Sequence, residues 1–460
     1  MDYPFIEQLQ EQLILDSFSI FCGAGATADL TKRKWEDIFH NKTKRFYEAK
    51  LSNDIYLLSD LEKNYYNKEN FYIDIKNKLT VGESVSNHIQ SIIKLNLNQI
   101  WTTNFDEIIE SAIKKEYGVE PIILSTSKDL LSKNINAEHV VYKLNGTIQD
   151  ETTMVLTKTD FFEYFKKQRL FFEILKRQLV LDSFLFIGYS FQDDLVLNAL
   201  REIKDVFPNN GQTHYRFVVN DYDEMKSNED KKLKEEFLKY EQLYFLDKYN
   251  IKTIQVDKYN QIDDYLSELY RRFCNHNILF CGSFRNIDNN LRLHIENIID
   301  IIIYELYRNK FNVYSGNGRG LGEIIVAQAK RHARYPYNRF INRPLIFTGD
   351  SIEVKENKNK QIEKDCNTML IFCGQDEGLT NSANVRKQFK DFIDKNDNKL
   401  VIPIPSTGYA AKEIFFSEDY RNSYSYRIMH SELESLVSLR EPTEIAKLVV
   451  GLIRKYRKEP

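Results

Sequence analysis

A glycine-rich segment near the N-terminus has residue types that suit phosphate binding. Gly23, Ala24, Gly25 and Thr27 lie in the sequence G-A-G-A-T, which directly follows the apolar run Phe18–Cys22. Small residues between a strand and a helix leave backbone N–H groups at a helix N-terminus, where an anion such as pyrophosphate can bind. The segment lacks the third glycine of the dinucleotide-binding fingerprint. A tight turn that needs glycine for steric reasons explains it almost as well.

Three further polar segments carry groups that can act on a ribose. Asn104 and Asp106 lie in T-T-N-F-D, Asn145 lies in L-N-G, and Gly188 and Ser190 lie in G-Y-S. An asparagine amide can hydrogen-bond a ribose hydroxyl, although it cannot accept a proton near neutral pH. Taken alone, Asn104 also fits an ordinary helix N-cap, because Asn followed by Phe-Asp-Glu suits capping.

The elements around these segments are typical of a parallel sheet with crossover helices, since short β-rich runs alternate with longer helical patterns. Each polar segment follows one such run, and ligands of open α/β sheets bind beyond the carboxyl ends of the strands. We therefore expect the four segments to converge on one crevice. The predicted strands are Ser17–Cys22, Gln99–Thr103, His139–Leu144, Phe184–Tyr189, Tyr215–Asn220 and Lys252–Val256. The predicted helices are Phe105–Lys115, Thr159–Leu181 and Leu195–Val206, and the charged stretch Lys226–Tyr240 is typical of a solvated helix face.

The pattern restarts after Cys274, so the sequence predicts two Rossmann-like parallel-sheet domains of the α/β class, residues 1–274 and 275–460. The predicted strands of the second are Asn277–Cys281, Phe311–Tyr314, Leu345–Thr348, Thr368–Cys373 and Lys399–Ile404. Four glycines in the seven residues 316–322 leave a concavity of backbone amides that suits phosphate or ribose. The candidate ligand-binding residues of this half are Gly282, Ser283, Gly316, Gly318, Arg319, Arg343, Gly374 and Glu377, with Arg386 as a further candidate. For each arginine the alternative is a surface ion pair, and for the glutamate it is solvation.

The four polar segments of the first half, in this order, resemble the sirtuin family, and most of all its bacterial antiphage branch. The resemblance covers roughly residues 5–274 and implies NAD as the substrate. It implies that Asn104 lies by the nicotinamide ribose and is needed for cleavage, and that Asp106 supports the same pocket. It also implies that Gly188 and Ser190 contact the adenosine side. The residues implied to hold the NAD pyrophosphate are Gly23, Ala24, Gly25 and Thr27.

Two departures from the sirtuin pattern bear on the reaction. Deacylating sirtuins carry a four-cysteine zinc module, whereas this chain has five cysteines and no C-x-x-C, so we expect no metal. Plain NAD hydrolysis is therefore favoured over protein deacylation. The second departure is that the family's L-H-G reads Leu144-Asn145-Gly146 here, and histidine is the group suited to general-base work near neutral pH. Asn145 is compatible with an engineered inactive form, a natural variant with weak turnover, or a non-catalytic NAD or ADP-ribose sensor.

The second half resembles the SLOG family of Rossmann-like nucleotide sensors over about residues 277–453. Related phosphoribohydrolases use a P-G-G-x-G-T-x-x-E motif, and the matching stretch here lacks the Pro-Gly-Gly and the following Glu. Ligand sensing is therefore favoured over catalysis in this half.

The fusion of the two domains resembles the Thoeris A effectors of bacterial antiphage defence. That resemblance implies a TIR-domain partner that makes a cyclic ADP-ribose signal on infection. The signal would bind the second domain and release cleavage of NAD to nicotinamide and ADP-ribose by the first. It also implies a homo-oligomer, either a tetramer or a filament.

Composition and charge argue against a nucleic-acid-binding, a membrane-spanning or a secreted protein. The 460 residues carry a net charge of -3, which favours neither nucleic acid nor a membrane surface as a partner. No run of ~18 apolar residues occurs, so no membrane-spanning helix is expected. Asp2, Glu7 and Glu11 interrupt the N-terminus, which argues against a signal peptide and favours the cytoplasm.

Overall fold

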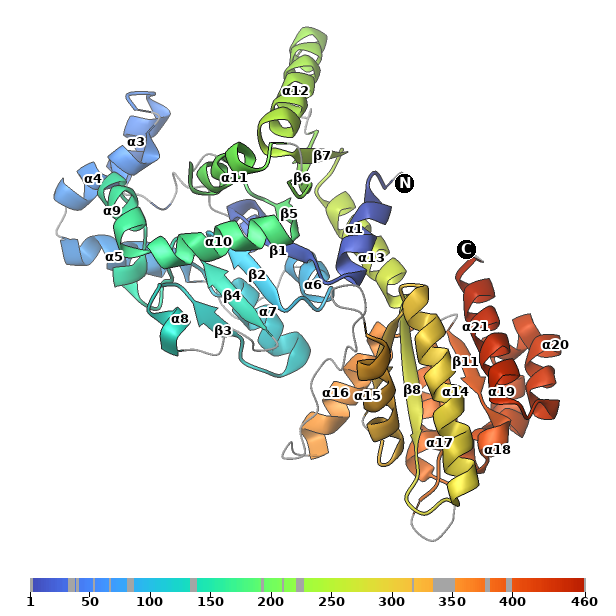
Figure 1. Ribbon diagram of the computed structural model, residues 1–460. Coiled ribbons are helices and arrows are strands. Elements are labelled where there is room, and N and C mark those ends of the chain that lie inside the picture. The colour runs from blue at the N-terminus through green and yellow to red at the C-terminus, as the bar shows by residue number, and fades with distance from the viewer. Residues whose placement is uncertain are drawn as a thin grey trace. The chain divides into compact units, whose positions relative to one another are not determined.

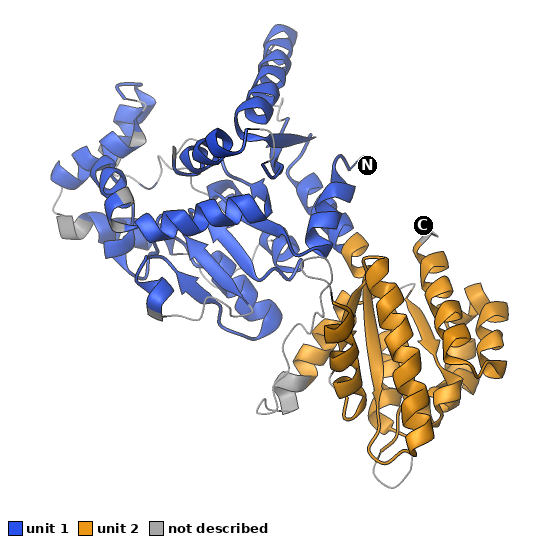
Figure 2. Cartoon of the chain, viewed as in Figure 1, with its two compact units in different colours: residues 1–270 blue, residues 271–460 orange. Residues whose placement is uncertain are grey.

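The chain divides into two compact units, residues 1–270 (unit 1) and 271–460 (unit 2), coloured separately in Figure 2. The division after Tyr270 falls inside helix α13 (Asn260–Cys274), whose last residue is the boundary expected from the sequence. The computed structural model describes residues 3–31, 38, 41–52, 54–65, 68–80, 87–132, 139–191, 194–208, 211–220, 227–316, 318–333, 352–376, 381–393 and 399–458.

Unit 1 is built on a seven-stranded parallel sheet with the order β3-β4-β2-β1-β5-β6-β7 (Figure 1). The six strands predicted from the sequence are present, and β3 is an additional one whose three residues are too few to show a periodic pattern. Every residue of β1 and β5 is buried, as expected for parallel strands that helices cover on both faces. The strands are β1 (Phe18–Cys22), β2 (Gln99–Thr102), β3 (Ile122–Leu124), β4 (Val140–Lys143), β5 (Ser183–Ile187), β6 (His214–Val219) and β7 (Ile251–Val256).

The helices of unit 1 depart from the prediction at two points. The helix expected at Phe105–Lys115 is Ile108–Tyr117. The expected helix Thr159–Leu181 is two helices, because Gln168 leaves the helical conformation with φ -116° and ψ 25°, and its side-chain oxygen accepts a hydrogen bond from Ser127 N at 2.7 Å. The helices are α1 (Ile6–Ile14), α2 (Ala28–Thr31), α3 (Asn41–Glu48), α4 (Ile55–Tyr65), α5 (Lys68–Leu79), α6 (Asn87–Ile93), α7 (Ile108–Tyr117), α8 (Asp129–Ser132), α9 (Lys158–Lys167), α10 (Arg169–Leu181), α11 (Asp194–Val206) and α12 (Asn228–Tyr249), followed by α13.

Unit 2 is a second parallel sheet, with the order β11-β10-β8-β9. Its long helix α14 buries Ile295, Ile298, Ile299 and Ile302, the spacing of one apolar helix face. The predicted strand Leu345–Thr348 lies outside the described residues. The strands are β8 (Asn277–Ser283), β9 (Asn312–Ser315), β10 (Thr368–Cys373) and β11 (Leu400–Pro403). The helices are α14 (Asn289–Arg308), α15 (Leu321–His332), α16 (Ile352–Asp365), α17 (Ala383–Ile393), α18 (Tyr409–Phe416), α19 (Glu418–Arg421), α20 (Tyr424–Ser438) and α21 (Pro442–Lys458).

Candidate nucleotide sites

The strand order of unit 1 brings the four polar segments of the sequence together. They follow β1, β2, β4 and β5, and these strands are neighbours in the order β4-β2-β1-β5. Since all four run parallel, their carboxyl ends lie at one edge of the sheet. After β4 the chain crosses to the other side of β1 and forms β5, so the segments surround the point where the strand order reverses.

The loops after β1 and β5 touch through their backbones. Gly23 N donates to Ile187 O and Gly25 N donates to Gly188 O, both at 2.9 Å. A Cβ atom on Gly23 would lie 2.4 Å from Gly188 O, and one on Gly188 would lie 2.1 Å from Ala26 N. Gly188 also has a φ of +63°, which side chains rarely adopt. Glycine is therefore required at these positions by the approach of the two loops.

This contact corrects one expectation for the G-A-G-A-T segment. The N–H groups of Gly23 and Gly25 are already bonded to the end of β5, so they are not open for an anion. The cause is that β1 and β5 are adjacent, and their hydrogen-bond ladder continues into the loops. Ala24 and Gly25 are exposed on this loop, while Gly23 and Thr27 are buried.

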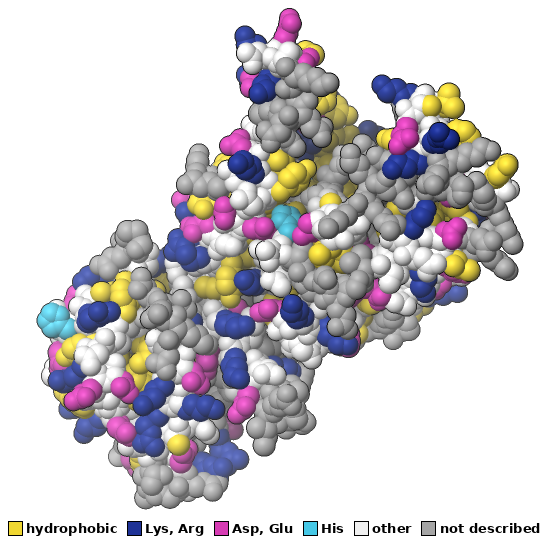
Figure 3. Space-filling model, turned by 180° about the vertical axis from the view of Figure 1, so that it is seen from behind, with side chains coloured by type: hydrophobic (Ala, Val, Ile, Leu, Met, Phe, Trp, Pro, Cys, Tyr) yellow, Lys and Arg dark blue, Asp and Glu magenta, His cyan; other side chains and the backbone are white. Residues whose placement is uncertain are grey.

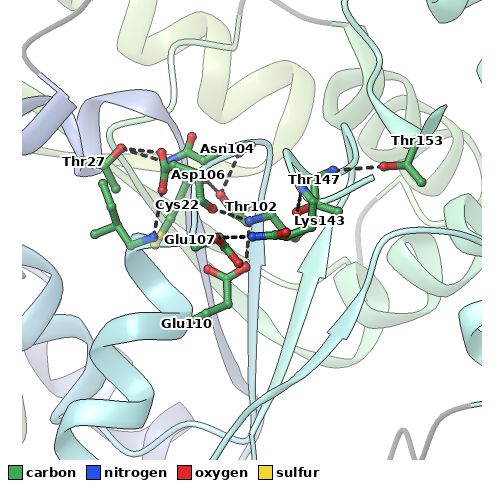
Figure 4. A network of polar contacts seen from close by, with 12 residues as sticks. Cys22, Thr27, Thr102, Asn104, Asp106, Glu107, Glu110, Lys143, Thr147 and Thr153 are labelled. Carbon is green, nitrogen blue, oxygen red and sulfur yellow. Dashed lines mark hydrogen bonds and ion pairs between the residues drawn. The ribbon is translucent and has the colours of Figure 1, made fainter. Parts of the chain in front are cut away.

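Asn104 is held in one orientation by the loop after β1 (Figure 4). Its Nδ2 donates to Gly23 O at 3.2 Å and to Thr27 Oγ1 at 3.1 Å. A carbonyl oxygen only accepts, so the amide nitrogen must face Gly23, and Asn104 Oδ1 faces elsewhere. That Oδ1 atom accepts no hydrogen bond from the residues that the structure describes. The alternative of a helix cap is wrong, because the cap of α7 is Glu107.

Asp106 completes a chain of hydrogen bonds to Asn104. Thr27 Oγ1 donates to Asp106 Oδ2 at 3.3 Å while it accepts from the Asn104 amide, and Ile108 N donates to Asp106 Oδ1 at 3.2 Å. The hydroxyl has one proton and two acceptors within reach, Asp106 Oδ2 and Ala24 O at 3.4 Å, and the carboxylate is the nearer and the stronger acceptor. The oxygen of Thr27 thus accepts from Asn104 while its proton points to Asp106. Burial raises the pKa of Asp106, and the nearby Lys143 cation opposes that rise.

Lys143 is a functional candidate that sequence reasoning missed. Its side chain is 1% exposed, and its Nζ donates to Glu110 Oε1 at 2.7 Å and to the backbone oxygen of Asp106 (Figure 4). Through these two hydrogen bonds, the Lys143 ammonium links the end of β4 to the segment that carries Asn104. Burial raises the pKa of Glu110, and Lys143 opposes the rise. The available signal was a lysine at the end of the buried strand V-V-Y-K, where an apolar residue is usual.

Asn145 is buried just beyond β4. Its backbone oxygen accepts from Val155 N at 2.9 Å, and its side-chain amide makes no hydrogen bond with a described residue. The next residue, Gly146, has a φ of +87°, and a Cβ there would lie 2.2 Å from Thr153 O. His139 cannot replace Asn145 as a base, because it precedes β4 at the opposite edge of the sheet, where it stacks on Tyr117.

The loop after β5 presents the other two predicted NAD contacts. Gly188 and Ser190 are both exposed, and Tyr189 between them is half-buried. The Tyr189 ring packs against Phe21 of β1, with ring centroids 4.7 Å apart. This ring contact holds the loop over the end of β1, and Gly188 and Ser190 face solvent.

Unit 2 contains a cavity of about 570 Å³, a size typical of small-molecule sites. Gly282, Ser283, Gly316, Gly318 and Arg319 line it, as expected from the sequence. Of the other predicted residues that the structure describes, Gly374 and Arg386 do not line the cavity. The N–H of Gly374 donates to Ser283 O at 3.1 Å, so this glycine shapes the turn beside the cavity. Arg343 and Glu377 lie outside the described residues, and Arg386 is ion-paired with Glu413 at 3.0 Å.

Other residues of the cavity wall come from segments without a sequence motif. They include cations, anions and amides on the loops after β8 and β10 and on α16 and α17, namely Arg285, Glu356, Asn359, Lys360, Glu363, Asp376, Lys387, Gln388 and Asp391. The Oδ1 atom of Asn359 is buried and accepts no hydrogen bond among the described residues. Cavity walls with both charge signs can pair with phosphate oxygens and accept from sugar hydroxyls. Packing also requires glycine at position 318, because a Cβ atom there would lie 1.9 Å from Gly282 O.

Comparison with known proteins finds a family match for a large part of each unit. Residues 98–254 match the family of SIR2-like domains, and residues 261–456 match the Sir2- and TIR-associating SLOG family. The chain joins a SIR2-like domain to a SLOG domain. This is the architecture of the Thoeris A effectors.

Relatives in three bacteria align along most of the chain. A protein of Bacillus cereus (strain MSX-D12) named NAD(+) hydrolase ThsA is 23% identical over 436 residues, which cover 91% of this chain and 90% of the relative. Proteins of the same name from Cytobacillus dafuensis and Acinetobacter baumannii (strain 532279) are 25% and 26% identical. The first covers 89% of this chain and 87% of the relative, and the second covers 98% of both.

Cysteine placement separates this SIR2-like domain from zinc-containing sirtuins. All five cysteines are buried and form no disulfide, and four of them belong to the SLOG unit. No group of His, Cys, Asp and Glu suited to a metal ion occurs among the described residues. In the same part of the chain, every helix is too short or too polar to cross a membrane.

Proposed function

We propose that this chain is a signal-gated NAD hydrolase of bacterial antiphage defence, acting in the cytoplasm. The observation that carries the proposal is the hydrogen-bonded chain Asn104–Thr27–Asp106 at the carboxyl edge of four adjacent strands. Full-length relatives named NAD(+) hydrolase support the same activity.

In unit 1, NAD would lie across the loops after β1 and β5. The exposed residues Ala24, Gly25, Gly188 and Ser190 would meet the pyrophosphate and adenosine, and Asn104 Oδ1 would accept from a hydroxyl of the nicotinamide ribose. The C–N bond to nicotinamide breaks with both electrons on the leaving group, so the ribose becomes oxocarbenium-like. Preorganised dipoles stabilise such developing charge, and Thr27 and Asp106 hold the Asn104 dipole in place.

The second half of the reaction is attack by water on the ribose, which releases a proton. A general base contributes typically ~10²–10⁴-fold to such a step. Asn145 occupies the family's histidine position and cannot accept that proton. We therefore propose slow turnover in this form, with ADP-ribose and nicotinamide as products.

Unit 2 would bind the activating signal, a cyclic ADP-ribose isomer made by a TIR-domain partner. The cavity suits such a ligand, because cations can pair with its phosphates and carboxylates can accept from its ribose hydroxyls. Arg285, Arg319 and Lys360 are the phosphate candidates, and Glu356 and Asp391 are hydroxyl candidates. Binding would release NAD cleavage in a homo-oligomer, either a tetramer or a filament.

A second function, a non-catalytic NAD or ADP-ribose sensor, is favoured by one observation, Asn145 in place of a base. A protein deacylase has less support, because unit 1 has one cysteine, Cys22, and a zinc module of that kind needs four. One experiment separates the three: nicotinamide release from NAD, with and without a cyclic ADP-ribose isomer, and with and without an acylated peptide. Release that needs only the cyclic nucleotide supports the hydrolase. Binding of NAD without release supports the sensor, and peptide-dependent release supports the deacylase.

A further inference from the structure

Lys143 is a buried cation close to the residues that the proposed reaction uses. It is the last residue of β4, and Asn145 follows two positions later. In the sheet it pairs with Thr102 of β2, which lies two residues before Asn104. On the face seen in Figure 3, Lys and Arg side chains lie at the surface among acidic ones, where water solvates their charge. Lysine is almost never fully buried without a partner, so this position calls for a reason beyond packing.

The ion pair of Lys143 gives only part of that reason. Its Nζ donates to Glu110 Oε1 at 2.7 Å and to the backbone oxygen of Asp106 (Figure 4). The second carboxylate oxygen of Glu110, Oε2, is buried and accepts no hydrogen bond from the residues that the structure describes. A buried pair that leaves an oxygen unbonded is seldom more stable than apolar side chains of the same volume. Stability alone therefore explains the lysine poorly.

The charge of Lys143 also acts on the Asp106 carboxylate. Burial raises the pKa of Asp106, and the Lys143 cation is the largest influence that lowers it. Glu110 of α7 and the neighbouring carboxylate Glu107 carry the same charge as Asp106 and oppose its ionisation. Cys22 of β1 also lies near, but burial raises the pKa of its thiol, which therefore stays neutral. Among these titratable groups, the Lys143 ammonium alone favours the ionised carboxylate.

The ionisation state of Asp106 decides the direction of its hydrogen bond with Thr27. An ionised carboxylate only accepts, so the Thr27 proton points to Asp106 and the Thr27 oxygen accepts from the Asn104 amide. A protonated carboxyl can donate to Thr27 Oγ1 instead, and the Thr27 proton then turns to Ala24 O, which is 3.4 Å away. Thr27 Oγ1 then accepts from two donors, and its hydrogen bond to Asn104 weakens.

We propose that Lys143 is a positioning residue for NAD cleavage: its buried ammonium keeps Asp106 ionised, and through Thr27 the carboxylate holds the Asn104 amide toward the ribose. The inference rests on the proposed function and deepens it, because it names the group that sets the charge of the site. A purely structural ion pair would stabilise the fold and leave the pH dependence of the reaction unchanged. The positioning role acts through the charge of Asp106, so it must change that pH dependence.

The first test measures nicotinamide release against pH, with the full chain and a cyclic ADP-ribose isomer at saturation. The chain with Asn145 suits it, because no histidine at that position adds a titration near neutral pH. Lys143→Met/Glu110→Leu replaces both charges by apolar side chains, a change that buried ion pairs often tolerate. We expect kcat near neutral pH to fall ~10-fold or more and to recover as the pH rises, because each unit by which a carboxyl pKa exceeds the pH lowers the ionised fraction about tenfold.

Glu110→Gln is the matched control, because it removes the carboxylate and keeps the Lys143 cation. We expect it to retain at least the rate of the starting chain near neutral pH. Far-UV circular dichroism checks that each variant is folded. A folded double variant with unchanged kcat and unchanged pH dependence overturns the inference, because Lys143 would then be structural only. A loss of rate that is equal at every pH overturns it as well, because such a loss does not depend on ionisation.

A second test needs no catalysis. Urea titrations give the difference in unfolding free energy between Asp106 and Asp106→Asn against pH, with Lys143 present and in Lys143→Met/Glu110→Leu. Because burial raises the native pKa of Asp106, the stability that its carboxyl contributes is lost as the pH rises through that pKa. Without Lys143 this loss is expected to extend to higher pH, and an unchanged range overturns the inference. Absence of nicotinamide release from the starting chain would instead contradict the proposed function, and the stability range would still decide whether Lys143 sets the charge of Asp106.

Discussion

Removal of the Thr27 hydroxyl isolates the link between Asp106 and the catalytic candidate Asn104. Thr27→Val replaces one hydroxyl by a methyl group in a buried position, so the packing volume is nearly kept. The 3.1 Å bond from Asn104 and the 3.3 Å bond to Asp106 are both lost, while Asn104 keeps its bond to Gly23 O. Hydrogen bonds in such a buried, charged setting contribute about 1–3 kcal/mol.

If that free energy serves to orient Asn104 in the transition state, kcat falls roughly 5- to 150-fold. KM stays near its wild-type value, because the adenosine and pyrophosphate contacts do not involve the Thr27 hydroxyl. The unfolding free energy falls by about 1–3 kcal/mol, because Asp106 loses a donor.

The assay is nicotinamide release at saturating signal, in the chain with Asn145 and in an Asn145→His background. Thr27→Ser, which keeps the hydroxyl, is the matched control and is expected to retain most of the rate. A folded Thr27→Val protein with a kcat within twofold of Thr27→Ser would refute the reasoning, because the relay would then contribute nothing to catalysis.

Four further predictions concern other parts of the two sites. Asn104→Ala abolishes nicotinamide release while circular dichroism stays unchanged, and retained turnover would exclude its catalytic role. Asn145→His raises the stimulated rate at least ~10-fold, since it restores a general base, whereas equal rates would show that the histidine role does not transfer. Lys143→Met lowers the unfolding free energy by about 3–5 kcal/mol in urea titrations, and adding Glu110→Leu recovers most of the loss. Because burial raises the pKa of Glu110, its contribution to stability is present below its unfolded-state pKa and is lost as pH rises, so the Lys143→Met defect is smaller in acid. Arg285→Ala weakens binding of the cyclic ADP-ribose isomer ~10-fold or more in calorimetry, and unchanged affinity would exclude this arginine from the site.

Much of the α/β fold was predictable, because strand and helix periods are local properties of the sequence. The runs that became β1, β2, β4 and β5 end in glycine or polar residues, and this order of features predicted the crevice before any strand order was known. Two elements escaped this reasoning. The three residues of β3 are too few for a pattern, and the break at Gln168 depends on its hydrogen bond to Ser127, a residue distant in sequence.

The sequence predicted which residues belong to the site of unit 1, but not their contacts. The sequence placed Asn104, Asp106 and Asn145 at strand ends. Taken alone, Asn104 fitted a helix cap better, and only the four segments together favoured a catalytic role. The start of α7, whose cap is Glu107, removed that alternative, and the hydrogen bonds to Gly23 and Thr27 showed what Asn104 binds instead.

By itself, the sequence determined two parallel-sheet units and four polar segments at their strand ends, because these follow from residue type and spacing along the chain. Only the tertiary structure decided which strands are neighbours, and with it the partners of each side chain. Adjacency of β1 and β5 engages the amides of Gly23 and Gly25, and adjacency of β2 and β4 brings Lys143 to Glu110. The cavity of unit 2 likewise combines helices whose sequences carry no motif. Hydrogen bonds and ion pairs depend on distances of a few ångströms between residues far apart in sequence, and those distances exist only once the sheet has formed.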